Sequence, residues 1–375
     1  MPALPLFAIN AIVMMAAALA FWLSGDLAPQ AIAHIAFGLG ILPLILAAIT
    51  YFVPVLTRSA GAPPQLLAVP LAAWLGAVCI VAAFAGAFDL TAASHAAFTL
   101  AAAAAIVLLL WIVRRARSAV GSPHPCLNWY LAALACLILA LLAVPAMALW
   151  PAQRAPLRLF HLHLNLLGFV SLTALGTLQV LLPTAAGRSD PAAARRLSSD
   201  LKFALAGALL IAGGAAFAKP LALLGVALFA IAPLRMGSAW TRLFADRIFR
   251  LYGAASSLAL AALGLLGLLA AGLAHAYGMI PGRPAIGGFV VAFLLPLVSG
   301  AATQLFPVWL RPGPQGAWHS SLRDALGRLA GVRALLMVGG GIAIACGWPQ
   351  GFWPAFAGVA IFALCALTSG KNLRH

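Results

Sequence analysis

Twelve apolar runs, each close to the length of a membrane-spanning helix, follow one another along the 375-residue chain. A helix needs about 20 apolar residues to cross the hydrocarbon core of a bilayer. With 65% apolar and 7% charged residues, the chain also has too little polar surface for a soluble globule. We therefore predict an all-α polytopic membrane protein, a single transmembrane domain over residues 1–375. The predicted spans are 5–23, 31–56, 67–87, 92–113, 128–149, 159–183, 201–217, 220–238, 249–275, 284–308, 329–347 and 351–368.

Only the pair Lys219 and Pro220 separates the seventh run from the eighth. We predict two helices here, since one merged helix would reverse every later span. The basic residues favour this count, because alternating loops place eighteen of the 22 on one side of the membrane. The positive-inside rule makes that side cytoplasmic, together with both termini, in a bacterial-type inner membrane.

The first apolar run is interpreted as a helix and not as a cleaved signal peptide. No basic residue precedes it and no small-residue cleavage site follows it. The basic residues that give the chain its net charge of +16 are then expected in the short loops at the membrane edge. We expect the lipid bilayer as a partner and no nucleic acid, because the basic residues do not form a folded domain.

Three predicted spans share a pattern in which a small residue lies seven positions ahead of a proline and an arginine ends the stretch. The stretches are 34–58, 163–188 and 287–311. They belong to the second, sixth and tenth spans, so the repeat unit is four helices and all repeats have the same orientation. We predict three parallel four-helix repeats, with the boundaries 1–117, 118–245 and 246–375. The alternative is chance recurrence of small residues and prolines in closely packed helices.

Histidines occupy matching positions in two of these spans. His34 and His163 each lie twenty residues ahead of the proline of their span. An ionisable side chain inside a span is costly and usually marks a functional site. Span alternation puts five histidines towards the outer face: His34, His95, His161, His163 and His275. We take His34, His163 and His161 as candidate metal ligands, with His95 and His275 as further candidates that also suit a simple position at a helix end.

The spacing of His161 and His163 favours haem over a small metal ion. Two residues on a helix turn by about 200°, so the imidazoles point into different spaces and cannot chelate one ion. Axial ligation of haem brings imidazoles from separate helices to opposite faces of the ring. We predict one or two b-type haems, the first held by His34 and His163, with His161 facing a second pocket.

Two further groups of residues fit a haem at the outer face. The first comprises arginines that would pair with haem propionates, or alternatively with lipid headgroups: Arg154, Arg158 and Arg283. The second comprises glycines that would leave room for a macrocycle, or alternatively allow close helix packing: Gly38, Gly40, Gly168, Gly287 and Gly288.

The run HLHLNLLGFVSLTALGTLQVLLPTAAGR resembles the haem-copper oxidase superfamily. It is similar to the helix of cbb3-type catalytic subunits that carries an H-x-H pair, and to the H-x-H…GF…G…P…GR segment of the NnrS family. The resemblance covers residues 31–58 and 159–188 at motif level. It implies twelve helices in three four-helix arcs. It also implies that His34 and His163 are the axial pair of a low-spin haem, and that His161 faces a high-spin haem or its remnant.

The chain departs from this family in several places. It has no H-P-x-x-Y motif and no adjacent histidines, so no pattern supports copper. It has no glutamate, so an acid-lined proton channel is missing and oxygen reduction coupled to pumping is not expected. In the NnrS pattern an acidic residue follows the second histidine, and here that residue is Leu164. The five cysteines lack a C-x-x-C-H motif, so any haem would be held non-covalently.

Three functions remain open from the sequence. The first is a non-pumping haem protein that transfers electrons or handles nitric oxide or another diatomic gas, with a quinol or respiratory subunit as electron partner. The second is a transporter or assembly factor for haem or copper. The third is a structural relative without a cofactor. The missing copper ligands argue against an enzyme, and any enzymatic activity would be that of an oxidoreductase.

Overall fold

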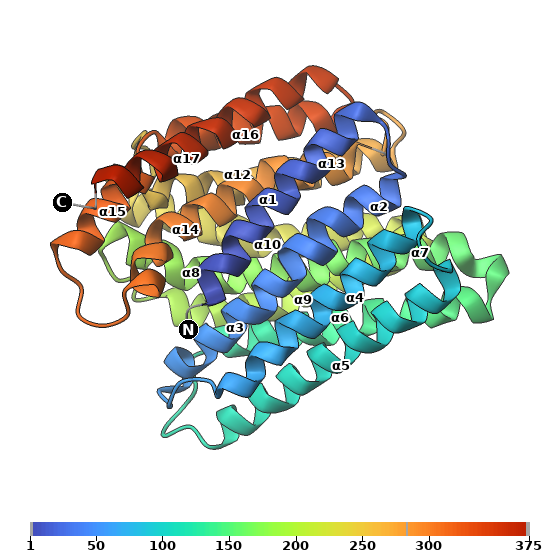
Figure 1. Ribbon diagram of the computed structural model, residues 1–375, viewed down its shortest axis with the longest axis horizontal. Coiled ribbons are helices and arrows are strands. Elements are labelled where there is room, and N and C mark those ends of the chain that lie inside the picture. The colour runs from blue at the N-terminus through green and yellow to red at the C-terminus, as the bar shows by residue number, and fades with distance from the viewer. Residues whose placement is uncertain (1–2, 283, 373–375) are drawn as a thin grey trace. The chain divides into compact units, whose positions relative to one another are not determined.

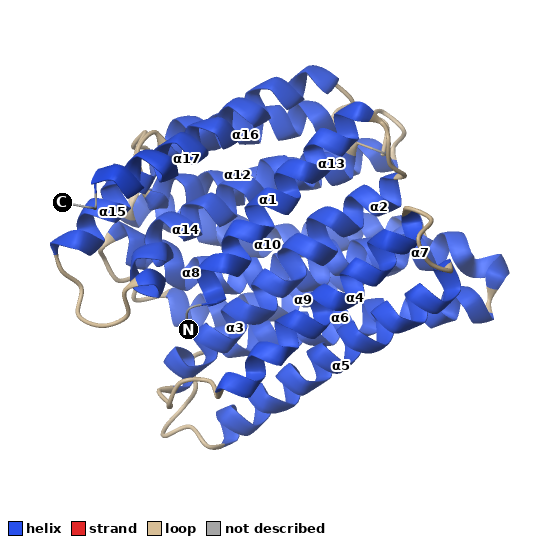
Figure 2. Cartoon of the chain, in the orientation of Figure 1, coloured by secondary structure: helices blue, strands red, loops and turns tan. Residues whose placement is uncertain are grey.

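The computed structural model describes residues 3–282 and 284–372. The elements of these residues are all helices (Figure 2). Among them, twelve segments are long and apolar enough to cross a membrane, which confirms the predicted number. Numbered in chain order, the spans are Ala3–Ser24, Pro29–Thr57, Pro64–Phe84, Leu90–Arg117, Cys126–Leu149, Pro151–Ala186, Ala193–Phe217, Lys219–Leu243, Ala254–Ala276, Ala285–Leu310, Ala317–Ala345 and Pro349–Ser369.

The predicted break between spans 7 and 8 is present. The helix α9 (Ala193–Phe217) ends at Ala218, whose extended backbone (φ −157°, ψ 93°) cannot continue a helix. The helix α10 (Lys219–Leu243) begins at the next residue. Spans 7 and 8 are therefore two helices, as the predicted topology requires.

Three spans begin eight or more residues earlier than predicted. Span 6 starts at Pro151 instead of residue 159, span 7 at Ala193 instead of residue 201, and span 11 at Ala317 instead of residue 329. All three added segments carry arginine, so a search for apolar runs does not detect them. Arg323 and Arg328, which were expected in a loop, consequently lie within span 11.

Contacts divide the chain into two compact units, which are described separately. Unit 1 comprises Met1–Leu19, Leu178–Pro191 and Pro233–His375, and unit 2 comprises Ala20–Thr177 and Ala192–Ala232. Four of the five candidate histidines belong to unit 2, and His275 belongs to unit 1.

Unit 2 is built from helices that alternate in direction along the chain (Figure 1). Besides α9, most of α10 and the first turns of α8 (Leu172–Ala186), its elements are α2 (Pro29–Ala33), η1 (His34–Ile41), α3 (Leu42–Thr57), η2 (Pro64–Leu67), α4 (Ala68–Phe84), α5 (Leu90–Arg117), α6 (Cys126–Leu149), η3 (Pro151–Gln153), α7 (Arg154–His163) and η4 (Leu164–Ser171). The segment η1 packs against α4, and η4 packs against both α6 and α9. Spans 2 and 6 are thus each lined by neighbouring spans of the same unit.

Unit 1 contains the remaining helices. Besides the ends of α8 and α10, they are α1 (Ala3–Ser24), α11 (Ala245–Ile248), α12 (Ala254–Ala276), α13 (Ala285–Phe289), η5 (Val290–Leu294), α14 (Leu295–Leu310), α15 (Ala317–Leu326), α16 (Ala330–Ala345), η6 (Pro349–Gly351) and α17 (Phe352–Asn372). The segment η5 packs against α12 and α16. Span 10 is therefore flanked by spans 9 and 11.

A π-helical segment interrupts spans 2, 6 and 10, the same spans that carry the repeated sequence pattern. These segments, η1, η4 and η5, end 13, 12 and 13 residues before Pro54, Pro183 and Pro307. Spans 6 and 10 are also the most buried. In the most apolar part of each span, 83% of the residues of span 6 and 78% of those of span 10 are buried, compared with 28% to 50% in the other spans. Because π-helical turns are rare and are frequent at functional sites, their recurrence marks these spans for attention.

In two of the predicted repeats, the small residue seven positions ahead of the proline contacts the same position of the preceding span. A Cβ on Gly176 would lie 2.7 Å from Cβ of Trp129, and one on Gly300 would lie 3.1 Å from Cβ of Ser257. Trp129 and Ser257 each come three residues after the first residue of their helix, α6 and α12. In both cases the small residue therefore lets a proline-containing span approach the preceding span.

Arg333 is a fully buried cation at the start of α16. Its Nη1 donates to the carbonyls of Leu326 (2.8 Å) and Arg328 (3.1 Å), and its Nη2 donates to Oγ1 of Thr303 (3.0 Å). Its guanidinium also lies 4.8 Å from the ring of Phe362. The last carbonyls of a helix have no partner within it. Arg333 therefore satisfies the carbonyl of the last residue of α15 and that of Arg328, in the turn between α15 and α16.

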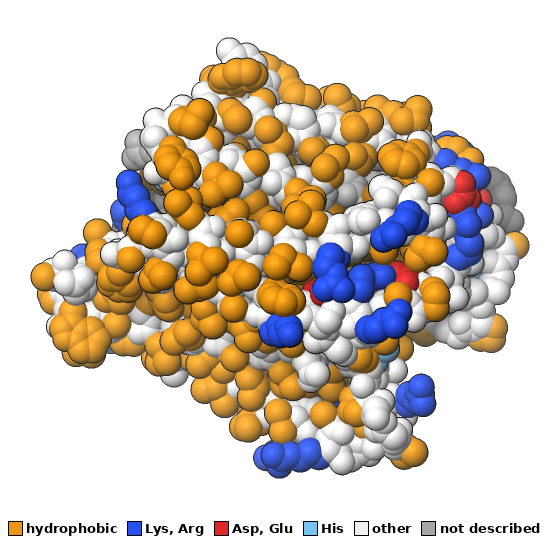
Figure 3. Space-filling model, turned by 180° about the vertical axis from the view of Figure 1, so that it is seen from behind, with side chains coloured by type: hydrophobic (Ala, Val, Ile, Leu, Met, Phe, Trp, Pro, Cys, Tyr) orange, Lys and Arg blue, Asp and Glu red, His pale blue; other side chains and the backbone are white. Residues whose placement is uncertain are grey.

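The outer surface of the helices suits a hydrocarbon environment. Figure 3 shows hydrophobic side chains over most of the visible face. Many large apolar side chains are exposed in mid-span, including Leu75, Leu139 and Leu263. Exposed tryptophans lie near span ends, as at the water interfaces of membrane proteins: Trp150, Trp348 and Trp353. The lipid bilayer expected from the sequence therefore fits this surface.

Substitution of Gly207 should destabilise the contact between α9 and α10. A Cβ there would lie 2.5 Å from the backbone nitrogen of Phe229, and backbone atoms cannot move aside cheaply. We expect Gly207→Ala to lower the midpoint of thermal unfolding in detergent, at a cost of about 1–3 kcal/mol. Gly213→Ala is the matched control on the same helix, since nothing lies within 4 Å of its added Cβ. Equal midpoints for the two variants would contradict this packing.

Candidate functional site

Three of the candidate histidines are held by backbone carbonyls through the same ring atom. The Nδ1 atom of His34 lies 2.7 Å from the carbonyl oxygen of Gln30, and that of His163 lies 2.8 Å from the oxygen of Leu159. The Nδ1 atom of His161 lies 2.8 Å from the oxygen of Ala140. A carbonyl only accepts, so Nδ1 carries the proton in each ring.

His34 and His163 have the same local environment in their spans. Each ring bonds to the carbonyl four residues earlier on its own helix. His34 is the first residue of η1, and His163 is the residue directly before η4. The offset shared by these histidines in the sequence therefore corresponds to one structural arrangement, an imidazole at the entry to a π-helical turn.

His161 is oriented differently from His163. Its bond to Ala140 crosses from α7 to α6, whereas His163 bonds within its own helix. The ring of Phe84, at the end of α4, lies 5.4 Å from the His34 ring. His34 is thus in contact with the end of span 3, and His161 with span 5.

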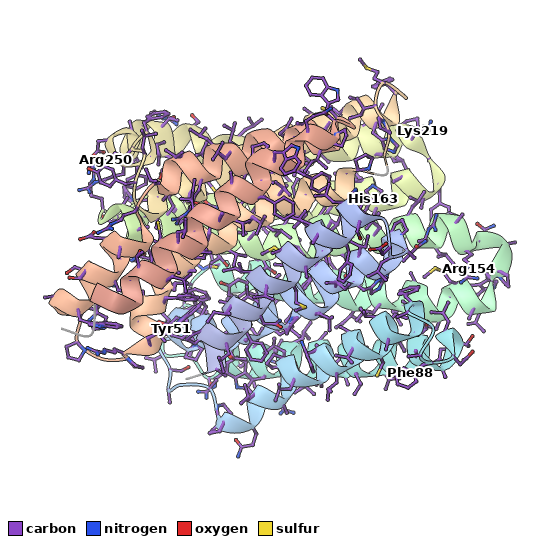
Figure 4. The ribbon with its side chains drawn as sticks, turned by 45° about the horizontal axis from the view of Figure 1, so that its top comes forward. Tyr51, Phe88, Arg154, His163, Lys219 and Arg250 are labelled. Carbon is purple, nitrogen blue, oxygen red and sulfur yellow. The ribbon has the colours of Figure 1, made fainter. Side chains whose placement is uncertain are left out.

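These histidines lie at one end of unit 2. Figure 4 shows Phe88, Arg154 and His163 towards this end and Tyr51, on α3, at the opposite end. We call it the histidine end, defined by the start of span 2 and the start of span 6.

The protonation of Nδ1 determines what Nε2 can do. In a neutral imidazole with a proton on Nδ1, Nε2 has a lone pair and can bind a metal. Histidine ligands of metals commonly donate their other N–H to a carbonyl in this way, which fixes the ring. Within the described part of the chain, no hydrogen bond involves Nε2 of His34 or of His161. Both rings are therefore arranged as ligands are.

Other histidines are not arranged as ligands in this way. His319 is buried, and both of its ring nitrogens form hydrogen bonds. Its Nδ1 accepts from the N–H of Gly316 (3.1 Å), and its Nε2 donates to the carbonyl of Arg311 (2.9 Å). His275 is exposed in unit 1, with Nδ1 3.3 Å from the oxygen of Ile280. His95 is exposed on α5. Among the described residues of unit 2, no hydrogen bond or ring contact joins His95 to His34, His161 or His163.

Arg154 and Arg158 are exposed on α7, in the turns that lead to His161. Among the described residues neither makes an ion pair, so both can bind an anion from solution or from a lipid headgroup. Arg283, the third predicted cation, lies outside the described residues.

The glycines expected to leave room for a macrocycle lie in close helix contacts. A Cβ on Gly168 would meet Cβ of Cys136 at 2.8 Å, and one on Gly38 would meet Cβ of Ala77 at 3.1 Å. In unit 1, a Cβ on Gly288 would lie 2.7 Å from Cβ of Ala345. These three glycines therefore serve the alternative predicted for them, helix packing.

Sequence reasoning missed the residues that orient the histidines. Gln30, Leu159 and Ala140 act through backbone carbonyls, which every residue type possesses. Only the first two could have been found, because a histidine inside a helix can reach the carbonyl four residues earlier.

The described residues contain no group of three or more His, Cys, Asp or Glu side chains that could hold a metal ion. In comparisons with known proteins, no protein-family model matches the chain, and no curated protein matches it. The candidate site therefore rests on its own geometry.

A change at His124, in the loop before α6, should alter the pH dependence of stability. Burial lowers the pKa of His124 from its usual 6.5, and its Nδ1 accepts from the N–H of Cys126 at 3.3 Å. The unfolded chain binds this proton near pH 6.5, so stability should be complete above that pH and fall as the pH drops towards the folded pKa. We expect His124→Asn, which retains an acceptor, to lose less thermal stability than wild type between pH 7.5 and pH 5.5. Equal losses would contradict the assignment.

Proposed function

We propose that this chain is a membrane haem protein in which His34 and His163 are the axial ligands of a b-type haem. The observation that carries the proposal is the common anchoring of Nδ1 in His34, His161 and His163 to backbone carbonyls. In His34 and His161 this anchoring leaves Nε2 available to a metal, and in all three residues it holds the ring against rotation. His161, fixed to the neighbouring span, is proposed to face a second haem.

The donor set suits haem better than a bare metal ion. A structural or catalytic metal site usually needs three or four protein ligands. Haem brings four nitrogen ligands of its own, so one or two imidazoles from separate spans are sufficient. His34, His161 and His163 lie on two spans of unit 2, and the described residues contain no three-ligand cluster, so these histidines suit haem better than a bare ion.

Each residue of the site has a defined role in this proposal. His34 and His163 hold iron and are kept in place by Gln30 and Leu159. Arg154 and Arg158, exposed at the histidine end, are positioned to neutralise carboxylates such as propionates. A bound haem would supply a one-electron iron centre for electron transfer from a quinol or respiratory subunit, or a site for nitric oxide or another diatomic gas.

We also propose that the twelve spans form three parallel four-helix repeats. Support comes from the π-helical turns of spans 2, 6 and 10 and from the matching contacts of Gly176 and Gly300. The distribution of basic residues supports an inner membrane location with both termini in the cytoplasm and the histidine end facing outwards.

The reduced-minus-oxidised absorption spectrum of the purified protein tests the haem. We expect a sharp α-band that disappears in His34→Ala and in His163→Ala, because each change removes an axial ligand. His161→Ala should leave this band and remove any binding of carbon monoxide, which needs an iron with an open position. His124→Asn is the control and should have the wild-type spectrum.

A colourless protein from cells supplied with haem would contradict the proposal. It would favour the alternative, a transporter or assembly factor that carries haem or copper without retaining it. An α-band that survives loss of both His34 and His163 would assign the haem to other ligands.

A further inference from the structure

Span 2 ends at an arginine with a left-handed backbone. Arg58, the residue after α3, has φ 51° and ψ 42°, a conformation that is uncommon for residues other than glycine. Hydrogen bonds fix the turn: the N–H of Arg58 donates to the carbonyl of Val55 (3.3 Å), and the N–H of Ser59 donates to that of Pro54 (2.9 Å). The left-handed conformation is therefore built into the end of the helix.

The equivalent turn of span 6 has glycine at this position. Gly187 lies four residues after Pro183, as Arg58 lies four residues after Pro54, and its φ is 71°. The N–H of Gly187 also bonds to the carbonyl three residues earlier, and the next N–H bonds to the carbonyl of Pro183, both at 3.2 Å. Glycine adopts this conformation freely, whereas a Cβ crowds the backbone. The turn itself does not need arginine, so we look to the side chain for its role.

Arg58 lies at the end of unit 2 opposite the histidine end, on the side of Tyr51 in Figure 4. Three arginines in the last turn of α5 lie at the same end. The Nη2 atom of Arg115, one of the three, donates to the carbonyl of Gly61 (3.4 Å). The three residues from Arg58 to Gly61 span at most about 11 Å. Spans 2 and 4 thus bring positive charges together in what we call the basic cluster: Arg58, Arg114, Arg115 and Arg117.

The carboxylates of unit 2 do not balance this cluster. Asp26 and Asp89 precede spans 2 and 4 and so lie towards the histidine end, and Asp200 is fully buried on α9. Arg58, Arg114 and Arg117 are exposed, and among the described residues their guanidinium groups make no hydrogen bond or ion pair. Their N–H groups are therefore available to an anion from outside the chain.

The position of the cluster matches the level of lipid headgroups. Arg58 directly follows the last residue of span 2, and the other three arginines end span 4. The guanidinium of Arg115 lies 5.7 Å from the ring of Trp111, and tryptophan is enriched where a span meets the headgroups. Several N–H donors on each arginine suit the oxygens of a phosphate. Anionic lipids also attract basic residues next to a span.

We propose that the basic cluster binds the phosphate of an anionic phospholipid headgroup, with Arg58 as the residue placed for this contact. Basic residues on one side of a membrane also set topology, and arginines in a last turn favour the helix dipole. Neither role calls for arginine at a left-handed position where span 6 has glycine. The proposal goes beyond the haem function, and its test does not involve haem.

Thermal unfolding of the full-length protein in neutral detergent, followed by circular dichroism, tests the site. Anionic phosphatidylglycerol or zwitterionic phosphatidylcholine is added to separate samples. We expect phosphatidylglycerol to raise the unfolding midpoint of wild type more than phosphatidylcholine does, and high salt to weaken this rise. Sodium phosphate at the same concentration should leave the midpoint unchanged, because a free anion lacks the acyl chains that hold a headgroup at the span ends.

Arg58→Gly should act in opposite directions on the two readouts. Without phospholipid its midpoint should exceed that of wild type by roughly 1–3 °C, because glycine relieves the left-handed conformation. Its rise with phosphatidylglycerol should be less than half of the wild-type rise. Arg58→Lys keeps the charge and should keep most of the rise. Arg195→Ala is the matched control, since Arg195 is an exposed arginine in the first turn of α9, outside the cluster.

The proposal is overturned if wild type does not respond to phosphatidylglycerol, if Arg58→Gly keeps the full response, or if Arg195→Ala loses as much of it. A rise with sodium phosphate equal to that with phosphatidylglycerol would assign the cluster to a free anion and not to a lipid. None of these readouts depends on haem, so the lipid site and the haem function can fail independently.

Discussion

Inside a bilayer, each polar group must find its hydrogen-bond partner within the protein, and this constraint orders the whole molecule. It explains why Arg333 is bound to carbonyls at the end of α15. It also explains His34, His161 and His163, whose Nδ1 atoms each bond to a carbonyl. The consequence for function is chemical, because a ring that donates from Nδ1 presents a lone pair at Nε2. A requirement of stability in lipid thus also prepares the imidazoles for a metal.

Span 6 is where fold and site meet. It is among the most buried spans, carries two of the histidines, and contains the π-helical segment η4. On one side His161 bonds to Ala140 of α6, and further along Gly168 and Gly176 bring the backbone against Cys136 and Trp129. This close contact fixes the rotation of span 6, and therefore the directions of His161 and His163.

The sequence predicted the architecture well, because span length in a bilayer is a strong constraint and the Lys219-Pro220 pair is a clear helix break. The matching positions of His34 and His163 were predicted from the sequence, and each ring bonds to the carbonyl four residues earlier. That the two rings hold one haem stays a prediction. The π-helical turns could not be predicted, since no residue pattern in spans 2, 6 and 10 requires them. For Gly168 two uses were predicted, room for a macrocycle or helix packing, and the structure shows packing on Cys136. The sequence alone could not decide between them, because a glycine in a sequence does not show what faces it.

The central feature of the proposed site is that His34 and His163 bind iron through Nε2. Protein produced with histidine labelled by ¹⁵N at Nε2 alone, then studied by electron-nuclear double resonance of its oxidised form, tests this claim directly. We predict ¹⁵N couplings from two axial nitrogens, which give way to ¹⁴N couplings when the label is moved to Nδ1. A low-spin haem signal without histidine ¹⁵N coupling, or with coupling only from Nδ1, would contradict the account.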